Sequence, residues 1–519
     1  MKNLKITFFA LCISAFSFAQ VGIGTNTPVA SSVLELKASD KALLLTRVAT
    51  TSAVTTPVNG MMVYDISTNC IKGYQNGAWT DCLSACGSSN NISNGGDWGL
   101  DFTSTVNQVI SNGTTAGLIS TDKKVFLWGY NSDKEFWDDF PAINNSFSRS
   151  TPVYKPLPNG ELAEKLGFTQ LITASYQGAV VLTSSGKIYG MSSLGHGPVI
   201  ANATPIAIGT WAEATLATEP TGFTDFAINS TSKYKILLGK SGKAYNGASN
   251  PAVQIPFPVG VTAFTKVWAN NNDAGAYGVF FKGNDNNIYA LEDNSGTYIG
   301  VGNTNPIALN STPQKVLFPS GVNIVDISTT TNNTLALAAD GTAYGFGYWR
   351  VTAVKFNFAA TPLPANVVND IIRIPSPINI PAGSTKFIGV YAGVNQSIVQ
   401  TDVATYVKGY NSGRIFMNPI AGNNVDAIVT YYDEADGANY NLVSPVLNNF
   451  KFFNFADIGS SKAYMFAIGK NNRAYFWGNP NSVGLWGLGG GLGLSGHIVP
   501  RPTPIATGIG DPTNPNPLY

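Results

Sequence analysis

One pattern recurs seven times between residues 126 and 475, and it limits the possible folds more than any other feature of the sequence. Each copy has a short apolar stretch, a connection that is usually rich in Gly, Asn or Asp, and a second short stretch with an aromatic residue. Stretches of this kind on either side of a turn are typical of β-hairpins. The seven aromatic positions, which we call the anchors, are Phe126, Tyr189, Tyr245, Tyr289, Tyr344, Tyr406 and Tyr475.

Two further signals accompany the anchors. An additional apolar stretch often precedes the hairpin, as at 224–228, 265–269, 323–327 and 453–458. Thr-Pro pairs begin another stretch at 151–152, 204–205, 312–313, 361–362 and 503–504. Because proline cannot donate a backbone hydrogen bond, it suits the first residue of a strand or a sheet edge. Each unit therefore offers about four strands in roughly 58 residues. This predicts an all-β fold, a seven-bladed β-propeller of about four-stranded blades with a small β-rich N-terminal module.

The two ends of the repeat suggest how the ring of blades closes. The unit of Phe126 has no Thr-Pro stretch before it, whereas the last unit is followed by an extra one at 502–505. We therefore expect the C-terminal strand to complete the first blade. Such closure removes an exposed sheet edge that would otherwise pair with other strands.

Composition excludes several function classes. Only 12% of the 519 residues are charged, and the formal net charge is +1. This charge gives no electrostatic basis for binding nucleic acid or an anionic membrane surface. An apolar content of 44% is too high for a wholly disordered chain.

The first residues have the features of an export signal. Lys2 and Lys5 form a basic start, residues 6–18 are largely apolar, and Ala19 precedes the expected cleavage site. We predict a signal peptide over 1–19 and a secreted or cell-surface protein. Because no other stretch approaches 18 continuous apolar residues, we expect no transmembrane segment.

Residues 20–86 form a separate β-rich module, joined by a Gly/Ser/Asn-rich linker at 87–98. Its three cysteines are Cys70, Cys82 and Cys86. In an oxidising compartment one disulfide is expected, and the Asn-Gly turn at 76–77 favours Cys70 with Cys82. A zinc site is the alternative, but both histidines are far away in the sequence.

This module also resembles a known kind of segment. The strings V-G-I-G-T-N-T-P (21–28), L-L-L-T-R-V (43–48), G-M-M-V-Y-D (60–65) and G-A-W (77–79) carry the resemblance. They are similar to an N-terminal segment of exported proteins of Bacteroidetes-type bacteria, which itself resembles phage tail-fibre tips. The resemblance implies a bacterial, surface-exposed module that can form homo-oligomers, with no known chemistry.

The repeats resemble those of the regulator-of-chromosome-condensation family. One example is W-G-Y-N-S-D-K-E-F (128–136) followed by S-T-P-V (150–153), and another is W-G-N-P-N-S-V-G-L-W-G (477–487) followed by R-P-T-P-I (501–505). The resemblance implies a seven-bladed propeller over about 99–510, which leaves 511–519 as a tail. The family's exchange activity on a nuclear GTPase is not carried over, because an exported chain would not meet that partner and a fold does not fix a function.

Residues with catalytic or metal-binding potential are few. His196 and His497 are the only histidines, and both are expected in loops. No G-x-S-x-G string is present, and Gly484–Gly493 lacks the context of a phosphate-binding loop. The acidic stretch 433–436 does not have the spacing of a helix-loop-helix calcium motif. We therefore predict no catalytic residues, no metal and no cofactor.

Aromatic residues in the connections between strands are the better binding candidates. Trp, Tyr and Arg are enriched at interface hot spots, and propellers present their loops together on one face. The alternative is that these residues cover the hydrophobic ends of blades. The candidates are Phe136, Trp137, Tyr348, Trp349, Arg350 and Trp486.

These observations support an exported, non-catalytic binding or adhesion module that presents propeller loops to a protein or glycan. Two alternatives stay open. The chain could inhibit an exported enzyme, because a secreted β-lactamase inhibitory protein has a similar propeller. It could also be a polysaccharide-acting enzyme, which would require titratable residues clustered at one end of the channel.

Overall fold

In its computed structural model, the chain divides into two compact units, Met1–Asn91 and Ile92–Tyr519. The structure describes residues 21–27, 31–41, 43–68, 70–75, 77–80, 105–111, 115–130, 148–170, 177–192, 198–207, 209–228, 233–269, 278–292, 299–303, 307–308, 310–330, 332–351, 354–355, 367–394, 396–410, 431–432, 447–457, 463–478 and 499–505.

The described part of the N-terminal unit contains short strands and the 3-10 turn η1 (Thr51–Ala53). Strand β1 (Val21–Ile23) pairs in parallel with β2 (Leu34–Leu36). A second sheet has the order β3-β4-β5-β6, formed by β3 (Arg47–Val48), β4 (Met62–Asp65), β5 (Cys70–Gln75) and β6 (Ala78–Trp79). Cys70 begins β5, whereas Cys82 and Cys86 lie outside the described residues, so the disulfide pairing stays a prediction.

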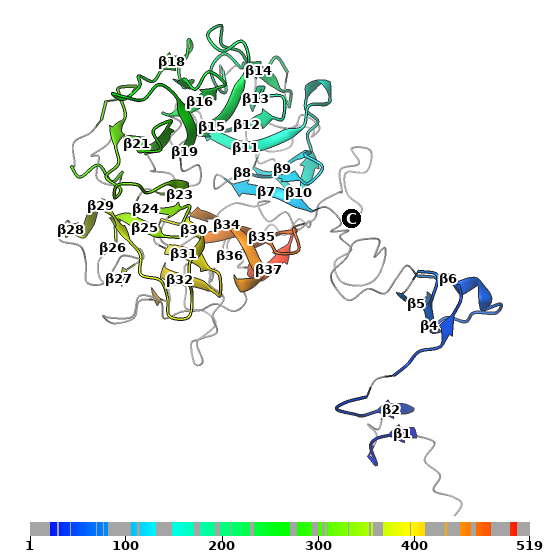
Figure 1. The fold of residues 1–519 in the computed structure, drawn as a ribbon. Helices are drawn as coiled ribbons and strands as arrows, with labels where there is room; N and C mark the ends of the chain where they lie inside the picture. Colours follow the sequence, from blue (N-terminus) through cyan, green and yellow to red (C-terminus); the bar gives the residue numbers. More distant parts are fainter. Residues whose placement is uncertain are drawn as a thin grey trace, which may run out of the picture. The chain divides into compact units, whose positions relative to one another are not determined.

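The second unit is a ring of seven antiparallel sheets, which confirms the predicted seven-bladed propeller (Figure 1). The first three blades are β7 (Val106–Ser111), β8 (Thr115–Ser120), β9 (Val125–Tyr130) and β10 (Ser148–Tyr154); β11 (Ala163–Gln170), β12 (Gln177–Thr183), β13 (Ile188–Ser192) and β14 (Ala212–Ala214); and β15 (Phe223–Ile228), β16 (Lys235–Gly239), β17 (Ala244–Asn246) and β18 (Val253–Gln254). Blade 4 is β19 (Phe264–Ala269), β20 (Val279–Gly283), β21 (Ile288–Leu291) and β22 (Gln314–Lys315).

Blade 5 is the largest sheet, with β23 (Ile324–Thr329), β24 (Asn333–Ala338), β25 (Ala343–Tyr348), β29 (Ile371–Pro377) and β28 (Val367–Val368). A small hairpin, β26 (Arg350–Val351) with β27 (Val354–Lys355), follows β25. Blade 6 is β30 (Phe387–Ala392), β31 (Gln396–Thr401), β32 (Thr405–Tyr410) and β33 (Tyr431–Tyr432). Blade 7 is β34 (Phe450–Asp457), β35 (Ala463–Gly469), β36 (Ala474–Gly478) and β37 (Val499–Pro504). The 3-10 turns η2 (Pro158–Gly160) and η4 (Leu447–Asn449) lie between blades.

Each anchor is the second residue of the third strand of its blade. In six of the seven blades, the residue three positions before the anchor has a positive φ and closes the turn between the second and third strands. This conformation favours Gly and Asn, which explains why these residues recur there. The six residues are Lys123, Gly186, Gly242, Asn286, Gly341 and Asn472.

The expected closure of the ring by strand exchange is wrong. Strand β10, which contains Thr151-Pro152, completes the first blade, and the C-terminal strand β37 pairs with β36 in the last blade. In these two blades, and in blade 4, where Thr312-Pro313 directly precedes the fourth strand, the Thr-Pro stretch belongs to the blade of the anchor before it. In a periodic sequence, a shift of one strand leaves the same pattern, so the repeat alone does not fix where a blade begins.

Side-chain packing closes the ring instead. A buried cluster joins Val106 and Trp128 of blade 1 to Phe466, Phe476 and Ile505 of blade 7. The Trp128 and Phe466 rings meet edge to face, with their centroids 5.8 Å apart. The Val106 N–H donates a hydrogen bond of 2.7 Å to the Asn472 carbonyl. Similar clusters fill the other spaces between neighbouring blades.

Candidate functional site: the central channel

The first strand of every blade carries an irregularity at the same place. After the first paired residue, the register shifts by one residue, so the next residue is skipped and lies exposed. Such a β-bulge turns the residue that follows toward a new direction. We call these following residues the bulge ring: Gln108, Lys165, Asp225, Lys266, Asp326, Gly389 and Phe452.

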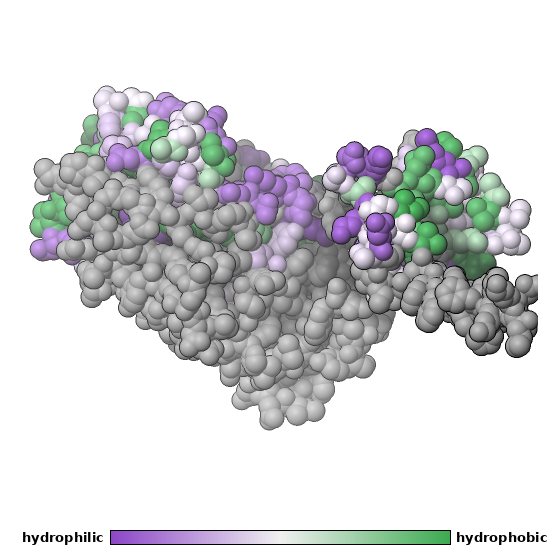
Figure 2. All heavy atoms as spheres, turned by 90° about the horizontal axis from the view of Figure 1, so that it is seen from below, coloured by the Kyte–Doolittle hydropathy of each residue, from purple (hydrophilic) through white to green (hydrophobic). Residues whose placement is uncertain are grey.

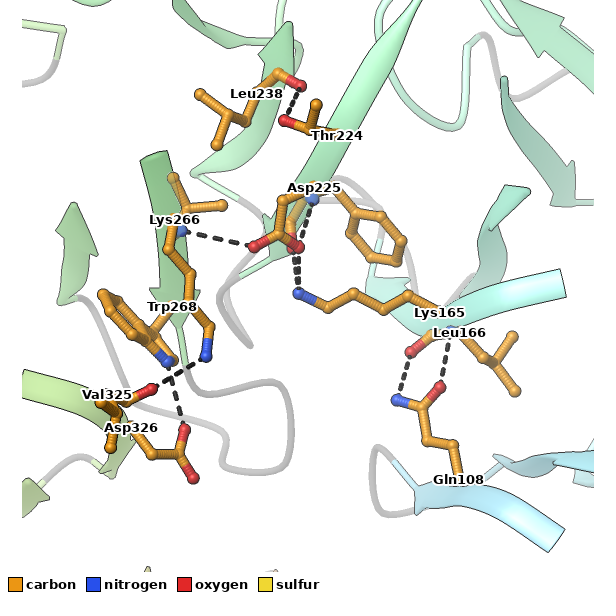
Figure 3. Close-up of polar contacts among 12 residues, drawn as sticks. Gln108, Lys165, Leu166, Thr224, Asp225, Leu238, Lys266, Trp268, Val325 and Asp326 are labelled. Atoms are coloured by element: carbon orange, nitrogen blue, oxygen red, sulfur yellow. Dashed lines mark hydrogen bonds and ion pairs between the residues drawn. The ribbon is translucent and has the colours of Figure 1, made fainter. Parts of the chain in front are cut away.

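The free edges of the first strands need hydrogen-bond partners, because no further strand pairs with them. Gln108 of blade 1 supplies them for blade 2. Its Nε2 donates to the Leu166 carbonyl at 3.1 Å, and its Oε1 accepts from the Leu166 N–H at 2.7 Å. One amide side chain thus replaces one residue of a neighbouring strand (Figure 3).

Lys165 makes the same kind of contact from blade 2 to blade 3. Its Nζ donates to Asp225 Oδ1 at 2.6 Å and to the Phe226 carbonyl at 2.6 Å. The ammonium also lies 5.1 Å from the centre of the Phe226 ring. Asp225 in turn accepts hydrogen bonds from the backbone N–H groups of Phe226, at 2.8 Å, and of Val267 in blade 4, at 3.4 Å.

Blade 4 contacts blade 5 through two side chains. Lys266 Nζ donates to the Val325 carbonyl at 3.0 Å and lies 4.8 Å from the centre of the Trp268 ring. Trp268 Nε1 donates to Asp326 Oδ1 at 3.2 Å (Figure 3). The cross-strand neighbour of Lys266 is Lys282, and burial together with the charge of Lys266 lowers the pKa of Lys282.

The remaining blades continue this arrangement. Ser328 Oγ accepts from the Ala392 N–H at 2.8 Å, and the Tyr391 hydroxyl donates to the Lys451 carbonyl at 3.0 Å. Asn454 Oδ1 accepts from the Ser111 N–H at 3.2 Å and so connects blade 7 to blade 1. Every blade therefore reaches the next one through a side chain of its first strand.

The seven first strands enclose a cavity of about 240 Å³. Its wall includes Lys165, Asp326, Ser328, Tyr391 and Asn454, and all seven first strands contribute residues to it. Burial raises the pKa of the Tyr391 hydroxyl far above its ordinary value, and the charge of Asp326 adds to this effect. The Tyr391 hydroxyl is thus a neutral hydrogen-bond donor at physiological pH.

The structure describes only three of the six predicted binding residues, the consecutive Tyr348, Trp349 and Arg350. Phe136, Trp137 and Trp486 lie outside the described residues. Tyr348 ends β25, and only the backbone of Arg350, in β26, is described. Trp349 was expected in an exposed loop, but its side chain is only 8% exposed and packs in a core cluster with Ile372.

The anchors also have defined surroundings. The hydroxyl of Tyr289 donates to Asp285 Oδ2 at 2.7 Å, and burial with this contact raises the pKa of Tyr289 to about 12. Six of the seven anchors are at most 7% exposed, and Tyr475 is partly buried. The anchors therefore occupy structural positions within the blades.

The other predictions about chemistry fall largely on residues that the structure does not describe, including His196, His497 and the stretch 433–436. Within the described part of the chain, no group of three or more His, Cys, Asp or Glu side chains is placed to hold a metal ion. No helix in that part has the length and apolar character needed to cross a membrane.

Sequence reasoning missed the bulge ring. Its signal is present in strings such as T-D-F-A-I (224–228), T-K-V-W-A (265–269) and N-I-V-D-I (323–327), where a charged residue interrupts an apolar strand. If the repeats had been aligned on their anchors, these charged residues would have fallen at matching positions in the first strands of several blades.

Comparisons with known proteins agree with both parts of the architecture. Residues 22–95 match a family described as a phage tail like trimerisation region. The fold is similar to Prp20p from Saccharomyces cerevisiae, with a TM-score of 0.51, 14% identity and coverage of 77% of this chain and 90% of that one. The report on that structure also describes binding of Prp20p to Gsp1p and histones.

Two other structures are similar at lower scores. Yeast RCC1 (Prp20) bound to Kap60 has a TM-score of 0.46 and 16% identity over 59% of this chain and 70% of that one. Human WBSCR16 has a TM-score of 0.39 and 14% identity over 78% and 83%. A comparison with curated proteins gives no significant match. The chain thus has an RCC1-like propeller after a tail-fibre-like segment, as the sequence predicted.

Proposed function

We propose that this chain is an exported, non-catalytic binding protein that assembles as a trimer and presents three propellers to a protein or glycan partner. The observation that carries the proposal is the covalent connection between a trimerisation-like segment at 22–95 and an RCC1-like propeller. A trimer would bind a repeated partner with high avidity even when each propeller binds weakly.

The N-terminal unit has the surface expected of an incomplete assembly. Of its described residues only Val63 and Asp65 are buried. Figure 2 shows hydrophobic residues on the surface of this unit. Apolar side chains exposed in this number favour a contact with further copies of the chain. The residues are Val21, Ile23, Val33, Leu34, Leu36, Leu43, Leu44, Val58, Met61, Met62 and Ile66.

The channel supports binding over catalysis. Lys165, Asp225 and Lys266 donate to, or accept from, the backbone of a neighbouring blade. These hydrogen bonds connect neighbouring blades. The charged side chains near the channel therefore have a structural role, which accounts for their presence without a catalytic one.

Light scattering on the mature chain, residues 20–519, tests the assembly. We expect a mass three times that of the chain. The double variant Leu34→Ser, Leu44→Ser should give a monomer, because both side chains are more than half exposed, at 54% and 81%. Leu162→Ser with Ile206→Ser changes two exposed residues of the propeller and serves as the control that keeps the trimer. A monomeric mass for the unchanged chain would contradict the proposal.

Export has its own test. The protein recovered from outside the cell, or from its surface, should begin at Gln20, as determined by N-terminal sequencing. A chain that stays in the cytoplasm with residues 1–19 attached would remove export from the proposal.

A further inference from the structure

The cavity keeps three polar groups that the contacts between blades do not use. Asp326 Oδ1 accepts from Trp268 and from the Ile327 N–H, whereas Oδ2 accepts no hydrogen bond from any residue that the structure describes. Ser328 uses its oxygen for the Ala392 N–H, which leaves its hydroxyl hydrogen available. Asn454 uses Oδ1 for Ser111, which leaves the two hydrogens of Nδ2. One acceptor and two kinds of donor therefore line the same cavity.

The charges of the bulge ring cancel. Lys165 pairs with Asp225, and Lys266 lies over the Trp268 ring, whose Nε1 donates to Asp326. From blade 2 to blade 5, cations and carboxylates thus alternate, with one charged side chain from each blade. An ionic ligand of either sign would meet a like charge as well as an opposite one, so the arrangement favours a neutral, polar ligand.

Aromatic rings complete the wall. Tyr391 and Phe452 are both partly exposed and meet edge to face, with their centroids 5.9 Å apart. Ligand sites combine such apolar surface with a few placed polar groups, and sites for drug-sized ligands occupy about 300–1,000 Å³. A cavity of about 240 Å³ is smaller and suits a compact ligand.

We infer that the central channel is a saccharide site that takes one or two pyranose units of a neutral glycan. A sugar ring has an apolar C–H face, which suits Phe452, and hydroxyl groups at its edge. These hydroxyls would donate to Asp326 Oδ2 and accept from Asn454 Nδ2 and the Ser328 hydroxyl. The inference rests on the proposed binding function and names its ligand class.

Titration calorimetry on the mature chain tests the site with glucose, galactose, mannose, N-acetylglucosamine and their β-1,4-linked dimers. We expect at least one sugar to bind with a Kd of about 1 mM or lower, which corresponds to about −4 kcal/mol. Asp326→Asn should weaken that binding at least tenfold. This change keeps the oxygen that accepts from Trp268 and replaces only the free acceptor. Phe452→Leu should also weaken it.

Asp340→Asn is the matched control, because Asp340 lies in an exposed turn of the same blade and accepts from the Thr342 N–H. It should bind sugar as the unchanged chain does. Sugar should also slow hydrogen exchange in β23 and β34. The inference is overturned if no sugar of the panel binds, if Asp326→Asn binds normally, or if glucuronate or glucosamine binds more tightly than the neutral sugars. A trimer that binds no sugar would contradict this inference alone, and a monomer that binds sugar would contradict only the trimer.

Discussion

Asn454 and Ser111 are 343 residues apart, yet the side-chain oxygen of Asn454 accepts a hydrogen bond of 3.2 Å from the Ser111 N–H. This contact joins the last blade to the first at the channel. The same space is filled by the apolar cluster of Val106, Phe466 and Ile505. The ring is thus closed by side chains, and its two ends contribute complete blades.

Asn454→Ala removes the acceptor of the buried Ser111 N–H. We expect the free energy of unfolding to fall by about 1 to 3 kcal/mol, the usual cost when a buried donor loses its partner. Thermal unfolding followed by circular dichroism measures this. Asn107→Ala, an exposed position of the first blade, is the control and should change stability by less than about 0.5 kcal/mol. Equal melting temperatures for Asn454→Ala and the unchanged chain would show that this contact does not stabilise the ring.

Ile505 tests the apolar part of the closure. Its side chain is 2% exposed and packs against both end blades, so Ile505→Ala should cost about 2 to 5 kcal/mol. Ile380→Ala changes an isoleucine that is 45% exposed and should have little effect. Deletion of 499–519 should destabilise the chain further, because it also removes β37 from the last blade. Denaturation midpoints for the three proteins compare these costs, and a neutral Ile505→Ala would disprove closure by this cluster.

Trp349→Ala distinguishes a core role from a binding role. Because the side chain is buried with Ile372, its removal should cost about 3 to 5 kcal/mol. Val259→Ala removes part of a fully exposed side chain and provides the comparison. Unfolding curves at fixed pH decide between the roles. If the melting temperature of Trp349→Ala were unchanged while partner capture fell, the original interpretation as a binding residue would be correct.

The sequence was most informative where local chemistry determines structure. The hairpins could be predicted because Gly186, Gly242 and Gly341 have the positive φ that each turn requires, three residues before an anchor. The bulge ring was harder to find, since one extra residue interrupts the two-residue period of the strand. The burial of Trp349 depends on β29, which follows only after the hairpin β26–β27. Contacts between segments so far apart leave no local pattern in the sequence.

Lys235 makes the stability of the propeller depend on pH. Its side chain is buried and donates a 2.8 Å hydrogen bond to the Val199 carbonyl, and burial lowers the pKa of Lys235 to about 8. In the unfolded chain the pKa is near 10.5. Between these values the unfolded state binds the additional proton, so stability should rise as the pH increases from 8 to 10.5.

The whole shift corresponds to about 3 kcal/mol. The Met side chain of Lys235→Met cannot titrate. As the pH rises from 8 to 10.5, the free energy of unfolding of the unchanged chain should therefore increase by up to about this amount relative to that of the variant. Below pH 8 the difference between the two free energies of unfolding should stay constant. Urea unfolding at pH 7, 8, 9 and 10 measures it. Lys240→Met removes an exposed lysine of the same blade and should follow the unchanged chain. Parallel pH profiles for Lys235→Met and the unchanged chain would show that Lys235 is not desolvated in the folded protein.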